Sequence, residues 1–146
     1  MLDAVIQRLA ALTDDANKAV FTDVEDALAL SEISQEPFRR GPKAYVIALD
    51  ENPRPDTRGT GPALQQVLAG VGVVIAIGKH NCRRGEKIRD ALEHIRQQVR
   101  GQLFGWAPTQ EHEPFVLGRG RLLAVQPGVV YWVDRFITEY CEDANS

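Results

Sequence analysis

The chain has 146 residues, of which 44% are apolar and 25% charged, the balance of an ordinary globular domain with one core. Its formal net charge of −3 at pH 7 argues against a dedicated nucleic-acid binder, which is usually basic. No apolar run reaches the roughly 18 residues of a membrane span, and the N-terminus lacks the basic start and cleavage pattern of a signal peptide.

The first third of the chain predicts two short helices and a strand. Apolar residues recur at helical spacing over residues 2–12, which predicts an amphipathic helix. We expect a short strand over residues 18–22. Asp23 then resembles a helix N-cap, so a short helix is predicted to follow it.

The middle of the chain predicts a long antiparallel hairpin. Residues 43–49 and 65–78 are rich in β-branched residues and are typical of strands. The polar segment 50–62, with three prolines and two glycines, is predicted to be a mobile loop between them. Gly70 and Gly72 indicate a bulge or bend inside the second strand.

The last part predicts a long helix followed by strands. An apolar stripe and a ladder of alternating charges favour a helix over residues 85–104, ending near Gly105 with Trp106 folded back on its last turn. Residues 115–125 read as two strands or one bent strand. Residues 129–140 are apolar on both faces at their start, which predicts a central strand, and residues 142–146 are expected to fray.

Together these elements predict a single α+β domain over residues 1–146. It has an antiparallel or mixed sheet, with the long helix and a second, N-terminal helix packed on one face. The residues expected in its core are Trp106, Trp132, Phe136, Leu92, Ile95 and Val99.

Few residues suggest chemistry. His80 and Cys82 lie two apart, beside Lys79, where a nucleophile or metal ligand is conceivable, but the other histidines lack ligand spacing with them. The "GRGR" segment at 118–121 lacks a phosphate-loop pattern and favours a bend between strands. The spacing of Cys82 and Cys141 gives no support for a disulfide. We therefore expect no enzyme activity, no cofactor and no metal.

The charge is unevenly distributed. Residues 1–36 hold eight acidic residues against two basic ones, a net charge of −6, which leaves +3 for the rest of the chain. This polarity suits copies that meet head to tail, although a solvated acidic surface explains it equally well. The candidate contacts with other subunits or partners are charged residues of the hairpin loop and of the helix start: Arg54, Asp56, Arg58, Arg83, Arg84 and Lys87.

The order of these segments resembles the tail terminator family of long-tailed bacteriophages and prophages over roughly residues 18–141. The resemblance rests on five segments taken together. These are "VFTDVEDALAL", "GPKAYVIALDE", "QQVLAGVGVVIAI", "RGEKIRDALEHIRQQVRGQLFGWAP" and "GRGRLLAVQPGVVYWVDRFITEY". Trp106, Trp132 and Phe136 match aromatic residues of the family.

The resemblance implies a structural role. Such proteins form a ring, usually of six subunits, on the completed tail tube in the virion. The ring stops tube polymerisation and offers a surface to neck proteins of the filled head. It implies a homo-oligomer whose partners are the tail tube protein and the head–tail connector or neck proteins, with genomic DNA passing through the lumen without specific binding, and no membrane.

Two other functions stay open from the sequence. A head–tail connector, stopper or tail completion protein belongs to the same machinery and would contact the portal side of the head. A small enzyme or ligand-binding domain would use the His80–Cys82 loop, and substitution of either residue would then abolish its function.

Overall fold

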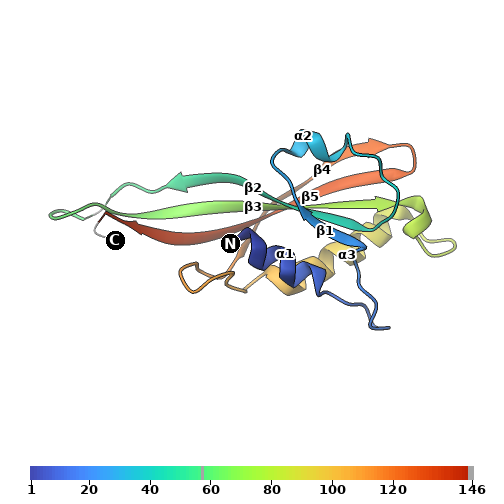
Figure 1. The fold of residues 1–146 in the computed structure, drawn as a ribbon, viewed down its shortest axis with the longest axis horizontal. Coiled ribbons are helices and arrows are strands. Elements are labelled where there is room, and N and C mark those ends of the chain that lie inside the picture. The colour runs from blue at the N-terminus through green and yellow to red at the C-terminus, as the bar shows by residue number, and fades with distance from the viewer. Residues whose placement is uncertain (57, 145–146) are drawn as a thin grey trace.

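The computed structural model describes residues 1–56 and 58–144 and has a five-stranded mixed sheet at its centre (Figure 1). The strands lie in the order β1-β2-β3-β5-β4, with β1 parallel to β2 and every other neighbouring pair antiparallel. Their bounds are β1 (Asp23–Asp26), β2 (Lys43–Pro53), β3 (Leu64–Gly78), β4 (Val116–Gln126) and β5 (Val129–Asp143). The predicted α+β class with a mixed sheet is confirmed, and β5 lies inside the sheet as expected.

Two helices cover one face of this sheet. α1 (Leu2–Ala10) and α3 (Ile88–Leu103) lie side by side beneath it in Figure 1. α1 packs against β1 and β2, and α3 packs against β3 and β5. Each helix buries one apolar stripe, because helical spacing places residues three and four apart on one face. The main core contains, among others, Val5, Leu9, Leu92, Ile95, Val99, Leu103, Val71, Val73, Ile75 and Phe136.

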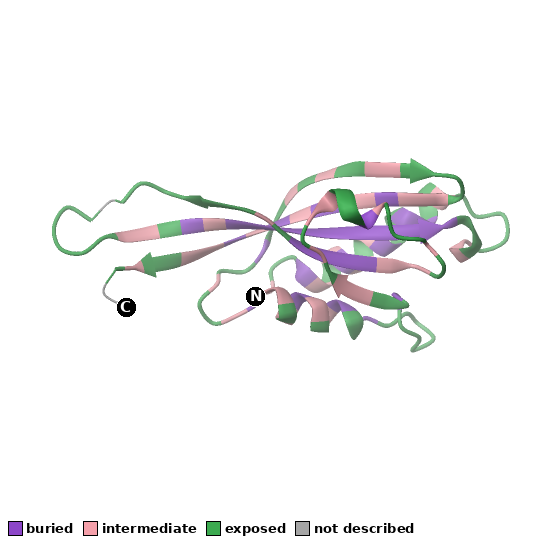
Figure 2. Ribbon diagram, turned by 45° about the horizontal axis from the view of Figure 1, so that its top comes forward, coloured by how far each residue is buried: buried purple, intermediate pink, exposed green. Residues whose placement is uncertain are grey.

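The other face of the sheet is covered only in part. A smaller core forms there around Ile33 of α2 (Leu30–Ile33). It contains Tyr45, Val74, Ala76, Tyr131 and Val133 from the strands. Residues 71–78 of β3 are therefore buried on both faces, which explains their continuous apolar run (Figure 2).

The β2–β3 hairpin and the end of β5 continue well past the helices as a three-stranded arm (Figures 1 and 2). We define the arm as residues 50–56, 58–70 and 137–144. The predicted loop was too long, because residues 50–53 continue β2 opposite 67–70. The predicted frayed end also began too early, since Asp143 pairs with Leu64. Both segments are polar, and their composition predicted loops. Their backbone groups are nevertheless hydrogen-bonded to β3, which makes them strands. Residues 145–146 lie outside the described part.

The predictions for residues 18–28 were wrong. Residues 23–26 form β1, and the short helix comes later, as α2. Asp23 is thus a strand residue paired with Lys43, not an N-cap. The backbone of this acidic segment finds its partners on the edge of β2, and such a tertiary pairing overrides local propensity. Residues 18–22 hold only an isolated bridge, between Thr13 and Ala19.

The irregularity expected in β3 lies in its partner strand instead. Ala48 pairs with Val71 and Asp50 with Gly70, so the extra residue is Leu49 of β2. A Cβ at Gly72 would lie 3.1 Å from Leu49 Cδ1. The glycine leaves room for the side chains of the bulged strand.

The long helix and the strands after it differ little from the prediction. α3 begins at Ile88, three residues later than expected, and the short η1 helix (Lys79–Asn81) precedes it. Gly105 has a φ of +80°, and the backbone N–H of Trp106 donates to the Leu103 carbonyl, 3.1 Å away. Residues 116–126 form one strand with two register shifts, the first at Gly118 and Arg119. The "GRGR" segment therefore lies inside β4 and is irregular there, and does not form the predicted bend between two strands.

Candidate interaction surfaces

The six charged residues predicted to make contacts separate into two groups at opposite ends of the molecule. Arg54, Asp56 and Arg58 lie at the tip of the arm (Figure 1). The other group follows η1 and leads into α3, and it consists of Arg83, Arg84 and Lys87. All six are exposed. The fold therefore does not bring them together into one site.

At the arm tip, the charged side chains bond mainly to the arm itself. The Arg54 guanidinium lies 2.8 Å from Glu139 Oε1 of β5. Asp56 Oδ1 accepts from the backbone N–H of Arg58 at 3.0 Å, and the Arg58 guanidinium donates to the Pro62 carbonyl at 2.9 Å. These bonds close the turn between β2 and β3 and hold its shape.

At the start of α3, by contrast, the basic side chains make few contacts with the rest of the protein. Glu86 Oε1 accepts from the Arg83 backbone N–H at 3.0 Å. Within residues 1–56 and 58–144, no ion pair involves the side chains of Arg83, Arg84 or Lys87. Their positive charge faces solvent at the N-terminal end of α3, where the helix dipole does not favour cations.

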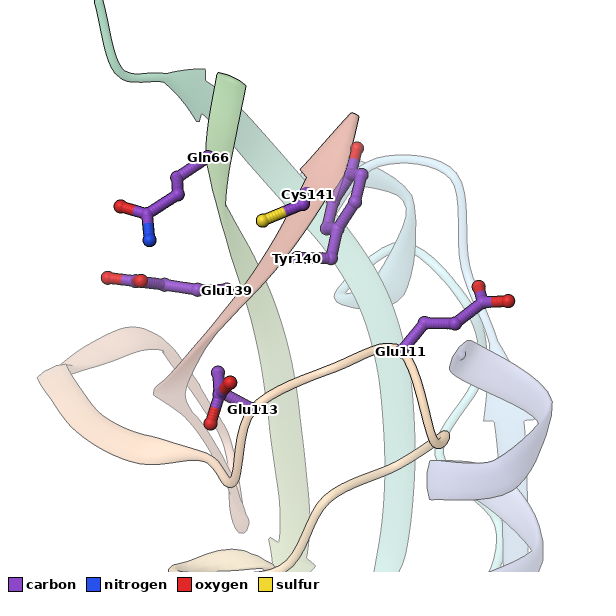
Figure 3. Close-up of a pocket in the computed structure, with 6 residues that line it drawn as sticks. All are labelled: Gln66, Glu111, Glu113, Glu139, Tyr140 and Cys141. Atoms are coloured by element: carbon purple, nitrogen blue, oxygen red, sulfur yellow. The ribbon is translucent and has the colours of Figure 1, made fainter. Parts of the chain in front are cut away.

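An acidic hollow lies under the arm (Figure 3). It has a volume of about 330 Å³ and is lined by Gln66, Glu111, Glu113, Glu139, Tyr140 and Cys141. Burial and the nearby Glu51 carboxylate raise the pKa of Tyr140. Burial also lowers the pKa of His112, whose ring contacts the ring of Tyr140 with 5.2 Å between centroids. The described residues contain no group of His, Cys, Asp and Glu able to hold a metal ion.

The His80–Cys82 loop is built around Asn81. Asn81 Oδ1 accepts from the Gly78 N–H at 2.8 Å, and its Nδ2 donates to the Gly41 carbonyl at 2.7 Å. His80 packs against Phe38, while Cys82 is half-buried against the main core. Burial and Glu86 raise the pKa of the Cys82 thiol, against the opposing effect of Lys79. A protonated thiol is a weak nucleophile, so the arrangement does not favour cysteine chemistry.

The residues expected in the core lie in or against it. Leu92, Ile95, Val99 and Phe136 are buried, whereas Trp106 and Trp132 are half-buried and pack on its border. Each of these two half-buried indoles has an arginine stacked over its ring. Arg8 Cζ lies 4.6 Å from the Trp106 ring centroid, and Arg96 Cζ lies 4.3 Å from that of Trp132.

The sequence did not predict a buried ion pair between Asp134 and Arg96. Asp134 on β5 is only 2% exposed. It accepts two bonds of 2.9 Å from the Arg96 guanidinium and one of 3.1 Å from Trp132 Nε1. Arg96 thus crosses from α3 to the sheet instead of joining the charge ladder predicted along the helix. The one feature of the sequence that could have indicated this pair is Asp134 itself, an acidic residue on the apolar face of a strand predicted to be central.

The two edges of the sheet were also not predicted as surfaces. β4 carries four exposed apolar side chains, Val116, Leu117, Leu122 and Val125, which are 38–65% exposed. β1, at the other edge, has the acidic sequence Asp-Val-Glu-Asp. Exposed apolar side chains along an edge strand are typical of a contact surface.

A family model described as phage tail terminator protein matches residues 2–145. The chain belongs to the phage tail terminator family. The resemblance seen in the five sequence segments is thereby confirmed and now includes the first helix. A search of the curated proteins found no match.

Membership of the phage tail terminator family indicates what kind of partner the surfaces described above contact. The chain is a structural protein of the phage tail, located in the virion, and it interacts with tail and head components. In the described part of the chain, no helix is both long enough and apolar enough to cross a membrane. Its surfaces must therefore provide contacts with other tail and head proteins.

Proposed function

We propose that the chain forms a ring of six subunits that caps the completed tail tube. The ring stops tube polymerisation and provides the surface to which the head–tail connector or neck proteins attach. The observation that carries this proposal is the family match over nearly the whole chain. The role is structural and requires no catalytic residue and no cofactor.

The shape of the fold supports a protein with two different neighbours. Its charged ends, the arm tip and the start of α3, lie far apart along the long axis (Figure 1). We propose that one end meets the tail tube and the other meets the neck. Arg54, Asp56 and Arg58 serve one contact, and Arg83, Arg84 and Lys87 serve the other.

The proposed ring leaves a channel for genomic DNA. The net charge of −3 per chain gives six subunits a strongly negative total, which repels phosphates. DNA would then pass without being held, because binding to its backbone depends on clusters of Lys and Arg that neutralise phosphates.

Electron microscopy of lysates from a phage that lacks this gene tests the proposal. Tails of excessive and variable length beside unattached filled heads are expected, because nothing then stops tube growth. Tails of normal length that fail to join heads would instead indicate a head–tail connector or stopper. Intact infectious particles would contradict both roles.

A further inference from the structure

The sheet has two open edges on opposite sides of the molecule. β4, of 11 residues, forms one edge, and β1, of 4 residues, forms the other (Figure 1). Each edge presents a row of backbone N–H and C=O groups that no strand of the described chain pairs with. An open edge in a protein that assembles with copies of itself is a template for a further strand.

The β4 edge carries apolar side chains that the two helices leave uncovered. Leu122 pairs with Trp132 and Val125 with Val130, so both share the face of the sheet on which α3 packs. They remain 49% and 65% exposed. α1 lies on the same face but at the opposite edge, beside β1.

The two edges are opposite in charge. Arg119 and Arg121 lie exposed on β4, and Arg121 pairs with Val133, which places it on the face away from α3. β1 carries Asp23, Glu25 and Asp26, and it belongs to the segment with a net charge of −6. A hydrogen bond with the Asp23 carboxyl, burial and the negative charge of Asp23 raise the pKa of Glu25, against the opposing effect of Lys43. A further cation at this edge would therefore relieve like-charge repulsion.

We propose that β4 of one subunit pairs with β1 of the next, so that the sheets of neighbouring subunits continue into one another around the ring. This inference rests on the proposed ring and identifies its subunit interface. The two strands run antiparallel in such a continued sheet, because β4 is antiparallel to β2 and β1 is parallel to it. Leu122 and Val125 then pack beneath the neighbour's α1.

Charge also excludes the symmetric alternatives. Two β4 edges would place Arg119 and Arg121 against the same arginines, and two β1 edges would bring acidic strands together. Like charges on paired strands are destabilising. Only the pairing of unlike edges matches opposite charges, and such a head-to-tail contact is the kind that closes into a ring.

Charge reversal at each edge tests the interface in a gene-deleted phage complemented from a plasmid. One variant carries Arg119→Glu and Arg121→Glu, a second carries Asp23→Arg and Asp26→Arg, and a third carries all four changes. A matched control reverses two exposed arginines that belong to neither edge strand, Arg39→Glu and Arg40→Glu. The readouts are the amount of the chain on purified, chemically crosslinked tails and the thermal melt of each purified variant.

We expect each single-edge variant to melt like the wild type but to be depleted from tails at least about tenfold, because like charges then face each other across every interface. The four-fold variant should recover, since the two reversed edges again match. The interface is wrong if a single-edge variant reaches tails as often as the control, or if a folded four-fold variant stays as depleted as its parents. The ring itself is wrong if the wild-type chain gives no crosslinked multimers on tails.

Discussion

Asp134 shows how one buried charge can fix the position of a helix on a sheet. A carboxylate removed from water is costly unless every lone pair finds a donor. Here Arg96 reaches it with two bonds of 2.9 Å, Trp132 Nε1 with one, and the Arg100 guanidinium lies 3.7 Å away. Gly120 on β4 lies directly against the carboxylate, so a larger residue there has no room. The pair therefore joins α3, β5 and β4.

Replacing Asp134 by Ala should reduce the free energy of unfolding by about 3 kcal/mol, because Arg96 is left without its partner. Urea denaturation followed by circular dichroism measures the change. Asp90→Ala is the matched control, since Asp90 forms only an exposed 3.9 Å pair with Arg89 and should change stability by about 0.5 kcal/mol or less. Equal effects of both substitutions would contradict the role of the buried pair.

Trp106 stabilises the junction between α3 and the segment that leads to β4. Its ring packs against Phe115 and beneath Arg8 of α1, and its carbonyl accepts from the Phe115 N–H at 3.1 Å. Trp106→Ala should cost about 2–3 kcal/mol through lost burial and ring contacts. The comparison is Phe104→Ala, which truncates an exposed aromatic two residues away. An unchanged melt for Trp106→Ala would show that the indole contributes little to the fold.

At the scale of elements, the arm and the central sheet share strands, but only the central sheet is covered by other layers of the fold. Residues 71–78 of β3 are buried between two layers, whereas residues 64–66 are half-buried or exposed. Opening the arm exposes little new apolar surface and should therefore cost less free energy than opening the centre.

Hydrogen exchange should consequently divide β3 and β5 into two parts. We expect amides of 64–68 and 139–143 to exchange at least about tenfold faster than those of 71–77 and 130–136. Mass spectrometry of peptic peptides gives these rates for the purified chain. Uniform protection along both strands would mean that the arm is as stable as the core, for example through contacts between subunits, and a dilution series would detect that.

The elements predicted correctly are those in which the spacing of apolar residues along the sequence shows which side chains are buried. The stripe from Ile88 to Leu103 specifies a helix lying on a surface, and the apolar run in β3 specifies a central strand. β1 could not be found this way. Its polar sequence becomes a strand only because β2 offers a free edge beside it.

The surfaces could also be predicted only in part, because they depend on contacts between distant parts of the sequence. The arginines of the arm tip and of the α3 start were identified by composition, but their placement at opposite ends depends on the path of the strands. The pairing of Asp134 with Arg96 joins residues 38 apart in the sequence, and no local pattern encodes it. The exposure of Leu122 and Val125 follows from the position of β4 at an edge, which the strand order alone decides.

For the whole molecule, an elongated subunit with a distinct charged group at each end should make two contacts that mutation can separate. The arm-tip variant carries Arg54→Ala, Asp56→Ala and Arg58→Ala. The α3-start variant carries Arg83→Ala, Arg84→Ala and Lys87→Ala. Every substituted side chain is exposed, so both variants should melt within a few degrees of the wild type.

Complementation of a gene-deleted phage should then give two different defects. The variant that loses the tube contact should produce overlong tails, because the cap no longer stops polymerisation. The variant that loses the neck contact should produce tails of normal length, capped but without heads. Tail lengths and the fraction of joined particles, counted by electron microscopy, distinguish the two outcomes and assign each end to its partner. Identical defects in both variants, or wild-type particle yields in both, would contradict a division of contacts between the two ends.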